Sequence, residues 1–385
     1  MKKNLFNGLM LAALFLASAG LTSCLNDDDE TIVLETPSTG IPDDSQATAN
    51  PEIPSGSTTT TIPNVQTTVD YVNGVPVIRI DMTGIKNTGD TDWMRLYGTG
   101  YSNQNVWVEV DGQPKGILVY NNADDAGTEN IPVDIVFTID NSSSMNEEAD
   151  LVAHDIKDWA EQLVKSGLNV RFGIVGYGGF IGGAIDLTTV EELSDYLDTY
   201  MGTSRTKHFG GKNATSLSDN AKNFPKTGTS TDSNECGAMA IQFADKYFTF
   251  RNGANRIYVN FTDEPNQPNR ITNYSVSFFS DQNNWPASKG TVHTVYSSND
   301  RQQEYPWLIS EYTGGTTIFT SSNFAGVTLS SLPVTGAMEN SYIIRFTNIS
   351  DLIDDGKTHL VHITVYSKDG KVRADKTFWV TFVSK

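Results

Sequence analysis

Residues 133–144 read VDIVFTIDNSSS, a nearly unbroken apolar run that ends in Asp140 and a serine-rich loop. A strand buried on both faces of a parallel sheet has this composition, because helices cover it on either side. The next stretch, residues 147–165, carries apolar side chains at helical spacing and acidic side chains on its other face. We therefore predict a central strand, a polar loop and a covering helix.

Strands and helices alternate through the rest of this block. Further strands are predicted at 170–177, 257–261 and 292–296, and further helices at 190–200 and 237–248. This alternation indicates a doubly wound, mostly parallel α/β sheet, whose binding site lies where the strands end. The glycine patterns of phosphate and dinucleotide loops are missing after the first strand.

Short β-rich segments flank the α/β block on both sides. They lie at 77–81, 106–110 and 116–120 before it, and at 342–346, 360–366 and 377–382 after it. Each group of strands is small for a separate domain. We therefore predict that the two groups form one small β-sandwich into which the α/β block is inserted. Two separate small sheets would give a similar pattern. The predicted boundaries are 69–129 and 326–385 for the sandwich and 130–325 for the α/β domain.

The N-terminal residues have the pattern of an export signal. Lys2 and Lys3 precede an apolar run that ends in Leu21-Thr22-Ser23-Cys24. This ending resembles the lipobox of bacterial lipoproteins, which implies that residues 1–23 are removed and that Cys24 carries the lipid. The alternative is an ordinary secretory signal with a chance cysteine.

An acidic cluster follows at residues 27–30, and residues 31–68 are rich in proline and threonine. The cluster resembles the surface-export signal of lipoproteins in Bacteroides-like bacteria, which implies a lipid-anchored protein on the outer membrane that faces the exterior. A solvated tether is the alternative. The composition of residues 24–68 predicts an extended linker, because it cannot bury a core.

The pattern Asp140-x-Ser142-x-Ser144, between a buried strand and an amphipathic helix, carries the family resemblance. It resembles the start of the metal-ion-dependent adhesion site (MIDAS) of von Willebrand factor type A (VWA) domains, and the likeness covers residues 131–322. The resemblance implies a bound Mg²⁺, or Mn²⁺ or Ca²⁺ in its place. Hydroxyl and carboxylate oxygens are the ligands that such hard cations prefer.

Two later loops match the remaining parts of that site. Asp263 ends a predicted strand, as the last metal residue of the family does, although a turn cap would also place an acid there. The middle loop, residues 228–237, resembles a variant of the family that carries an aspartate, and we assign Asp232, with Thr231 as the alternative. Asp232 could also be a helix N-cap.

Charge and composition exclude several function classes. The chain has 27 Lys and Arg against 46 Asp and Glu, a net charge of −19, which disfavours nucleic-acid binding. Two cysteines, Cys24 and Cys236, exclude a disulfide scaffold. Gly-x-Ser-x-Gly and His-Glu-x-x-His are missing and the five histidines lack metal-ligand spacing, so we expect no enzyme activity.

These observations favour a surface-anchored lipoprotein that binds a protein or extracellular-matrix ligand. The ligand would contribute an acidic group to the divalent cation of the VWA domain. The alternative is a structural or assembly subunit of a surface appendage or envelope complex, in which the metal only stabilises the loops.

Overall fold

The structure is a computed structural model that describes residues 39–384, with gaps at 53–54, 63–64, 87–91, 99–102, 122–131, 147, 200–208, 210–216, 298–303, 321–323 and 325–326. The chain divides into two units, Met1–Thr36 and Pro37–Lys385, and the described residues all belong to the second. The predicted signal peptide, Cys24 and the first part of the linker lie outside the described residues. Within the described part, no helix is long and apolar enough to cross a lipid bilayer.

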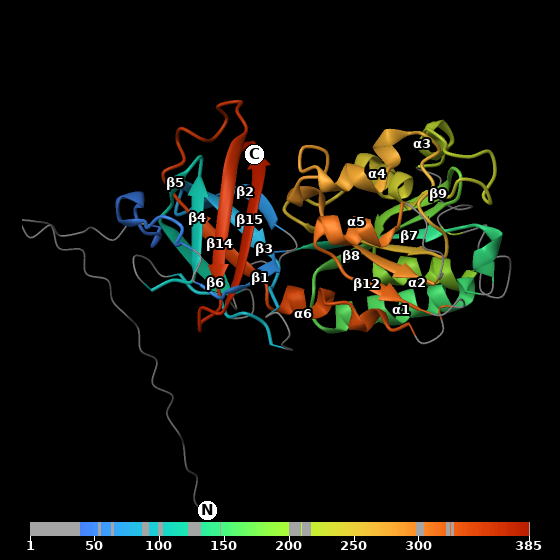
Figure 1. Cartoon of the computed structure of the whole chain (residues 1–385), viewed down its shortest axis with the longest axis horizontal. Helices are drawn as coiled ribbons and strands as arrows, with labels where there is room; N and C mark the ends of the chain where they lie inside the picture. The colour runs from blue at the N-terminus through green and yellow to red at the C-terminus, as the bar shows by residue number, and fades with distance from the viewer. Residues whose placement is uncertain are drawn as a thin grey trace, which may run out of the picture. The chain divides into compact units, whose positions relative to one another are not determined.

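A six-stranded sheet in the order β12-β11-β10-β7-β8-β9 forms the centre of the α/β domain (Figure 1). All neighbours pair in parallel except β8 and β9, which are antiparallel. The predicted fold class is therefore confirmed. The strands are β7 (Val133–Asp140), β8 (Val170–Tyr177), β9 (Ile181–Thr188), β10 (Asn255–Thr262), β11 (Thr291–Tyr296) and β12 (Thr317–Phe319).

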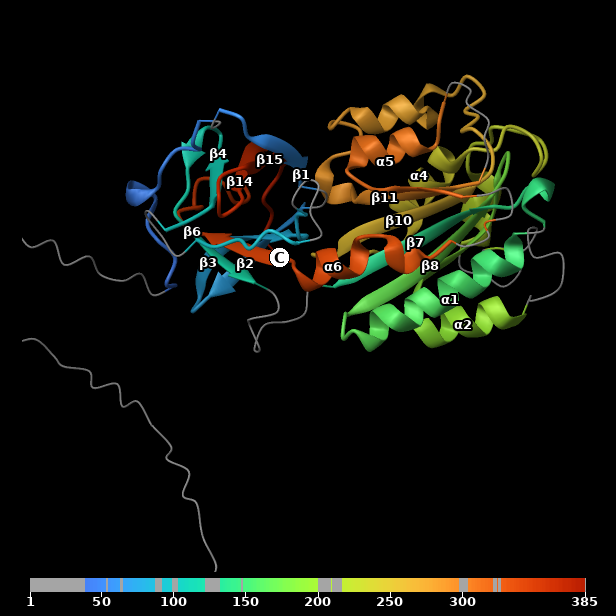
Figure 2. The ribbon, with the colours of Figure 1, turned by 60° about the horizontal axis from the view of Figure 1, so that its bottom comes forward.

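Helices cover both faces of this sheet (Figure 2). One face packs against α1 (Ala149–Lys165), α2 (Val190–Thr199) and α6 (Val334–Glu339). The other packs against α3 (Ser218–Asn223), α4 (Gly237–Tyr247) and α5 (Trp307–Thr313). Short 3-10 helices connect these elements and the strands: η1 (Asp44–Gln46), η2 (Ser143–Asn146), η4 (Thr272–Tyr274), η5 (Val276–Ser280), η6 (Ala287–Lys289) and η7 (Leu329–Ser331).

Strand β7 is buried along its whole length, as its apolar sequence predicts. Ile135, Phe137 and Ile139 belong to the core under α1, where the Trp159 ring packs edge-on against Phe137 at a centroid distance of 6.1 Å. Val136 points to the opposite face and packs in the core under α4. Successive side chains of a strand point to opposite faces of the sheet. A strand covered on both faces therefore needs apolar residues at odd and even positions alike.

A β-sandwich of two sheets makes up the rest of the described chain. One sheet has the order β1-β15-β14-β4-β5 and the other β2-β3-β13-β6. The strands are β1 (Thr58–Thr61), β2 (Val65–Val72), β3 (Val75–Met82), β4 (Val106–Val110), β5 (Gln113–Pro114), β6 (Ile117–Asn121), β13 (Tyr342–Phe346), β14 (His359–Tyr366) and β15 (Val372–Val380).

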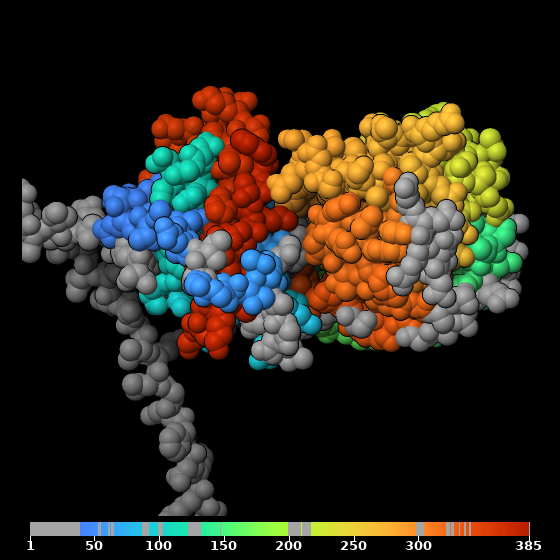
Figure 3. All heavy atoms as spheres, viewed as in Figure 1, coloured from blue at the N-terminus to red at the C-terminus, as the bar shows by residue number. Residues whose placement is uncertain are grey.

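Each sheet of the sandwich combines strands from both ends of the chain. Strand β13 pairs with β3 and β6, and β14 pairs with β4 and β15. In Figure 3 the blue and cyan atoms of the early strands accordingly lie beside the red atoms of the late ones. The α/β domain is therefore inserted into one sandwich, and the alternative of two separate sheets does not hold.

The structure departs from the predicted boundaries at both ends of the sandwich. Strands β1 and β2 begin before residue 69, within the stretch given to the linker, and β1 pairs with Val372–Asp375 of β15. Its four threonines are β-branched and favour a strand once a partner is available. At the other end, η7 and α6 fall in the range 326–385 but pack into the α/β core through Leu332, Val334 and Met338.

The buried imidazole of His293 on β11 should make stability depend on pH. Burial lowers the pKa of His293 from 6.5 to about 4. Between these values the unfolded chain binds the proton and the folded chain does not, so the free energy of unfolding falls as the pH falls. The loss from this residue should reach about 2.5 kcal/mol near pH 4.5.

His293→Asn tests this expectation, because the Asn Oδ1 can accept the Thr316 backbone N–H that His293 Nδ1 accepts at 3.0 Å. Urea unfolding of both proteins near pH 7 and near pH 4.5 should show a smaller loss in the variant. Equal losses in the two proteins would contradict the assignment.

Candidate metal centre

Asp140 is the last residue of β7 and is fully buried. Its carboxylate accepts a hydrogen bond from the Ser142 backbone N–H at 2.9 Å and from the Thr262 hydroxyl at 3.0 Å. Thr262 is the last residue of β10, which pairs with β7 in parallel up to Ile139 and Phe261. The strand pairing thus fixes the buried carboxylate between two loops that are distant in sequence.

The serine loop, held to Asp140 by the Ser142 backbone N–H, extends through its two hydroxyls to Asp263. Ser142 Oγ and Ser144 Oγ lie 2.9 Å apart, and Ser144 Oγ donates to Asp263 Oδ1 at 3.1 Å. Ser142 is buried, whereas Ser144 is exposed and Asp263 is half-buried. Four of the five predicted residues therefore form one connected cluster of oxygen atoms that opens to solvent.

Asp232 reaches the same loop from its outer side. It is exposed, and its carboxylate accepts from the Ser143 backbone N–H at 2.6 Å and from the Ser143 hydroxyl. It is not joined by a hydrogen bond to Ser142, Ser144 or Asp263 in the described structure. The alternative residue, Thr231, donates to Asp232 Oδ2 at 3.4 Å.

Two glycines allow the loop of Asp232 to approach β8 so closely. A Cβ on Gly178 would lie 2.3 Å from the Thr231 carbonyl oxygen, and one on Gly179 would lie 2.0 Å from the Ser233 carbonyl oxygen. The Gly179 N–H also donates to the Ser230 carbonyl at 3.2 Å. The Gly178-Gly179 pair that follows β8 is thus needed to bring residues 230–233 to the metal edge.

Carboxylates crowd this edge and perturb one another. Burial, helped by the charge of Asp263, raises the pKa of Asp140 to about 7. The pKa of Glu235 is raised to about 9. Burial is the largest cause, and the negative charges of Asp140, Glu264, Asp263 and Asp232 add to it. Burial also raises the pKa of Asp263. A cation bound here would oppose all of these effects, because a nearby positive charge favours the ionised carboxylate.

The donor set fits a hard divalent cation, since the clustered side chains offer only oxygen. In the described part of the chain, no three His, Cys, Asp or Glu side chains converge closely enough to hold a metal by themselves. The predicted site does not need them, because two of its ligands are serine hydroxyls. The thiol of Cys236 is buried and lies 3.2 Å from Asn266 Oδ1, and burial raises its pKa to about 12, so it offers no thiolate.

Thr262 and Glu235 belong to this edge but were not among the predicted site residues. Thr262 holds Asp140, and Glu235 brings a further buried carboxyl group close to the predicted acids. The sequence did carry a signal for Glu235, because it is an acidic residue of the middle loop, residues 228–237, that was assigned to the site. Nothing in the sequence distinguishes Thr262 from any other strand threonine.

The stretch that joins α2 to α3 touches the motif through the described residue Phe209. Asn141 Nδ2 donates to the Phe209 carbonyl at 3.2 Å, and a Cβ on Gly176 would lie 1.7 Å from the same oxygen. The Phe209 side chain is buried. Residues 200–208 and 210–216 lie outside the described residues.

No family model and no curated protein matches the sequence. Two structures of proximal thread matrix protein 1 from the mussel byssus resemble the chain at 13% and 14% identity, with TM-scores of 0.36 and 0.37; the second has a zinc-occupied MIDAS motif. Each covers 59% of this chain, which spans about half, 49%, of theirs. The human COPII-coat protein Sec24c matches at 9% identity and a TM-score of 0.34, and the match covers 90% of this chain and 65% of the Sec24c chain. Likenesses of this size establish neither the family nor a ligand.

Removal of the Thr262 hydroxyl should weaken the support of Asp140. Thr262→Val removes a donor from a buried carboxylate, which we expect to cost about 2 kcal/mol in metal-free buffer. Thr138→Val is the matched control, because the Thr138 hydroxyl is equally buried and donates to the neutral amide oxygen of Asn260 at 2.8 Å. Urea unfolding should show the larger loss for Thr262→Val; an equal or smaller loss would contradict the role given to this hydroxyl.

Proposed function

We propose that this chain is a surface lipoprotein, anchored to the outer membrane through Cys24, whose VWA-type domain binds a partner through a divalent cation. The partner would be a protein or extracellular-matrix component that offers an acidic group. The proposal rests on one observation above all, the cluster in which Asp140, Ser142, Ser144 and Asp263 are joined by hydrogen bonds at the ends of β7 and β10. It assigns binding and no reaction to the chain.

Ser142, Ser144 and Asp263 would hold the cation directly, with Asp140 and Asp232 supporting them. A bound Mg²⁺ or Mn²⁺ would supply a positive charge that an acidic group of the partner can complete. Hydroxyl ligands leave most of the cation's charge available, whereas each carboxylate neutralises part of it. A carboxylate at Asp232, beside the loop rather than within the serine cluster, would weaken the attraction only modestly.

The overall charge of the chain supports a strict dependence on the cation. With a net charge of −19, and with the exposed Asp232 beside the serine loop, the protein repels an acidic partner when no metal is bound. Binding of the partner should therefore require the metal rather than merely improve with it.

Calorimetric titration with Mg²⁺ and with Mn²⁺ tests the metal site. We expect one saturable site, a loss of affinity of about tenfold or more for Asp263→Asn and for Asp140→Ala, and a smaller loss for Asp232→Asn. Asp158→Asn, on the exposed face of α1, is the matched control and should bind as the unmodified chain does. Heat signals that are absent, or unchanged in Asp140→Ala, would refute the site.

Capture experiments separate the adhesive function from the structural alternative. The immobilised chain would be incubated with solubilised matrix proteins and with envelope extracts, then washed with and without a chelator. An adhesive partner should be released by the chelator and should fail to bind a Ser142→Ala/Ser144→Ala double variant. A partner that stays bound in both tests would favour a structural subunit instead.

A further inference from the structure

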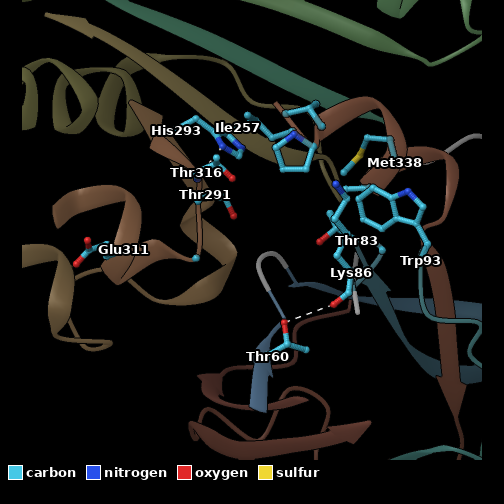
Figure 4. Close-up of a pocket in the computed structure, with 16 residues that line it drawn as sticks. Thr60, Thr83, Lys86, Trp93, Ile257, Thr291, His293, Glu311, Thr316 and Met338 are labelled. Carbon is cyan, nitrogen blue, oxygen red and sulfur yellow. Dashed lines mark hydrogen bonds between the residues drawn. The ribbon is translucent and has the colours of Figure 1, made fainter. Parts of the chain in front are cut away.

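A cavity of about 320 Å³ lies where β10 and β11 begin, at the edge of the sheet opposite to the candidate metal centre. The segment that follows β3 lines one side with Lys86 and Trp93, next to Met338 of α6 (Figure 4). The other side is lined by Ile257 of β10 and His293 of β11. Binding sites for small molecules commonly have volumes of about 300–1,000 Å³, apolar walls and a few polar groups. They often lie between domains.

The Trp93 wall is fixed in place by the backbone around it. Lys86 and Trp93 form an antiparallel bridge, and the Gly84 N–H donates to the Ala337 carbonyl at 2.8 Å. A Cβ on Gly84 would lie 3.0 Å from the indole ring, and one on Gly336 would lie 2.4 Å from it. Because backbone from both sides meets the ring this closely, the position of the indole is fixed.

A positive charge stands beside this aromatic wall. The Lys86 Nζ lies 5.6 Å from the centre of the Trp93 ring, and the Lys86 side chain is exposed. Among the described lining residues the one acid is Glu311 on α5, which is also exposed and lies on the other side of the cavity from Lys86 and Trp93 (Figure 4). A lysine in this position favours a ligand with a negative group at the Trp93 side.

His293 offers a second polar group from the inner wall. Its Nδ1 accepts the Thr316 backbone N–H at 3.0 Å, so the neutral ring carries its proton on Nε2. Burial keeps the ring neutral at ordinary pH, because it lowers the pKa of His293 to about 4. Within the described residues Nε2 has no hydrogen-bond partner, which leaves a donor for an acceptor oxygen of a ligand.

We propose that this cavity binds a small organic carboxylate with an apolar or aromatic body. The body would lie against Trp93, Ile257 and Met338. The carboxylate would pair with the Lys86 ammonium, and an uncharged acceptor oxygen farther along the body would accept the His293 Nε2–H. The site is separate from the proposed metal centre and should work in the presence of a chelator.

A series of three probes with the same phenyl body tests the assignment in buffer with EDTA. 3-Benzoylpropionate carries both a carboxylate and a ketone, 4-phenylbutyrate lacks the ketone, and 4-phenylbutylamine replaces the acid with an ammonium group. Ligand-detected NMR titration of the full chain should give a Kd of about 1 mM for 3-benzoylpropionate. We expect about fivefold weaker binding for 4-phenylbutyrate and none for the amine.

Lys86→Met should weaken the binding of 3-benzoylpropionate about fivefold. Lys165→Met is the matched control, because this exposed lysine lies at the end of α1 and does not line the cavity, and it should bind as the unmodified chain does. Both lysines are exposed, so neither change should prevent folding. The proposal is overturned if no probe binds saturably, which would make the cavity a packing gap. It is also overturned if the amine binds as well as the acid, or if Lys86→Met has no effect.

Discussion

Parallel pairing of β7 with β10 is the constraint on which the candidate site depends. It brings Asp140 and Thr262, separated by 122 positions in the sequence, within one hydrogen bond at the same edge of the sheet. The buried Asp140 carboxylate then holds the Ser142 N–H and so orients the serine loop. A carboxylate this deeply buried is tolerated only because donors surround it, and the same geometry crowds further acids around one point.

The sandwich contributes to the α/β domain by holding its two connections together. Strand β6 ends at Asn121 and β13 begins at Tyr342, and these two residues face each other in register. Tyr342, the first residue of β13, is also buried in the apolar core of the sandwich. The two ends of the inserted domain are therefore held side by side, which lowers the entropic cost of closing so long an insertion.

Local patterns predicted the parts of the fold that depend on local sequence. The apolar run of β7 and the helical periodicity of α1 were sufficient for both elements, and strand order then placed Asp140, Ser142 and Asp263 at one edge. Long-range pairing could not be predicted in the same way. The four threonines of β1 resemble a linker until β15, more than 300 residues later, supplies a partner. The contact of Asp232 with Ser143 depends on the Gly178-Gly179 pair that follows β8, which no pattern around Asp232 reveals.

Diffraction can test directly whether three separate loops share a single divalent cation. Crystals grown with Mn²⁺ would be measured at a wavelength that gives an anomalous signal from the metal. The account predicts one strong peak about 2.2 Å from both the Ser142 and Ser144 hydroxyl oxygens, with Asp263 beside it. At saturating Mn²⁺, an empty serine cluster, or a peak only at some other group of acids, would contradict it.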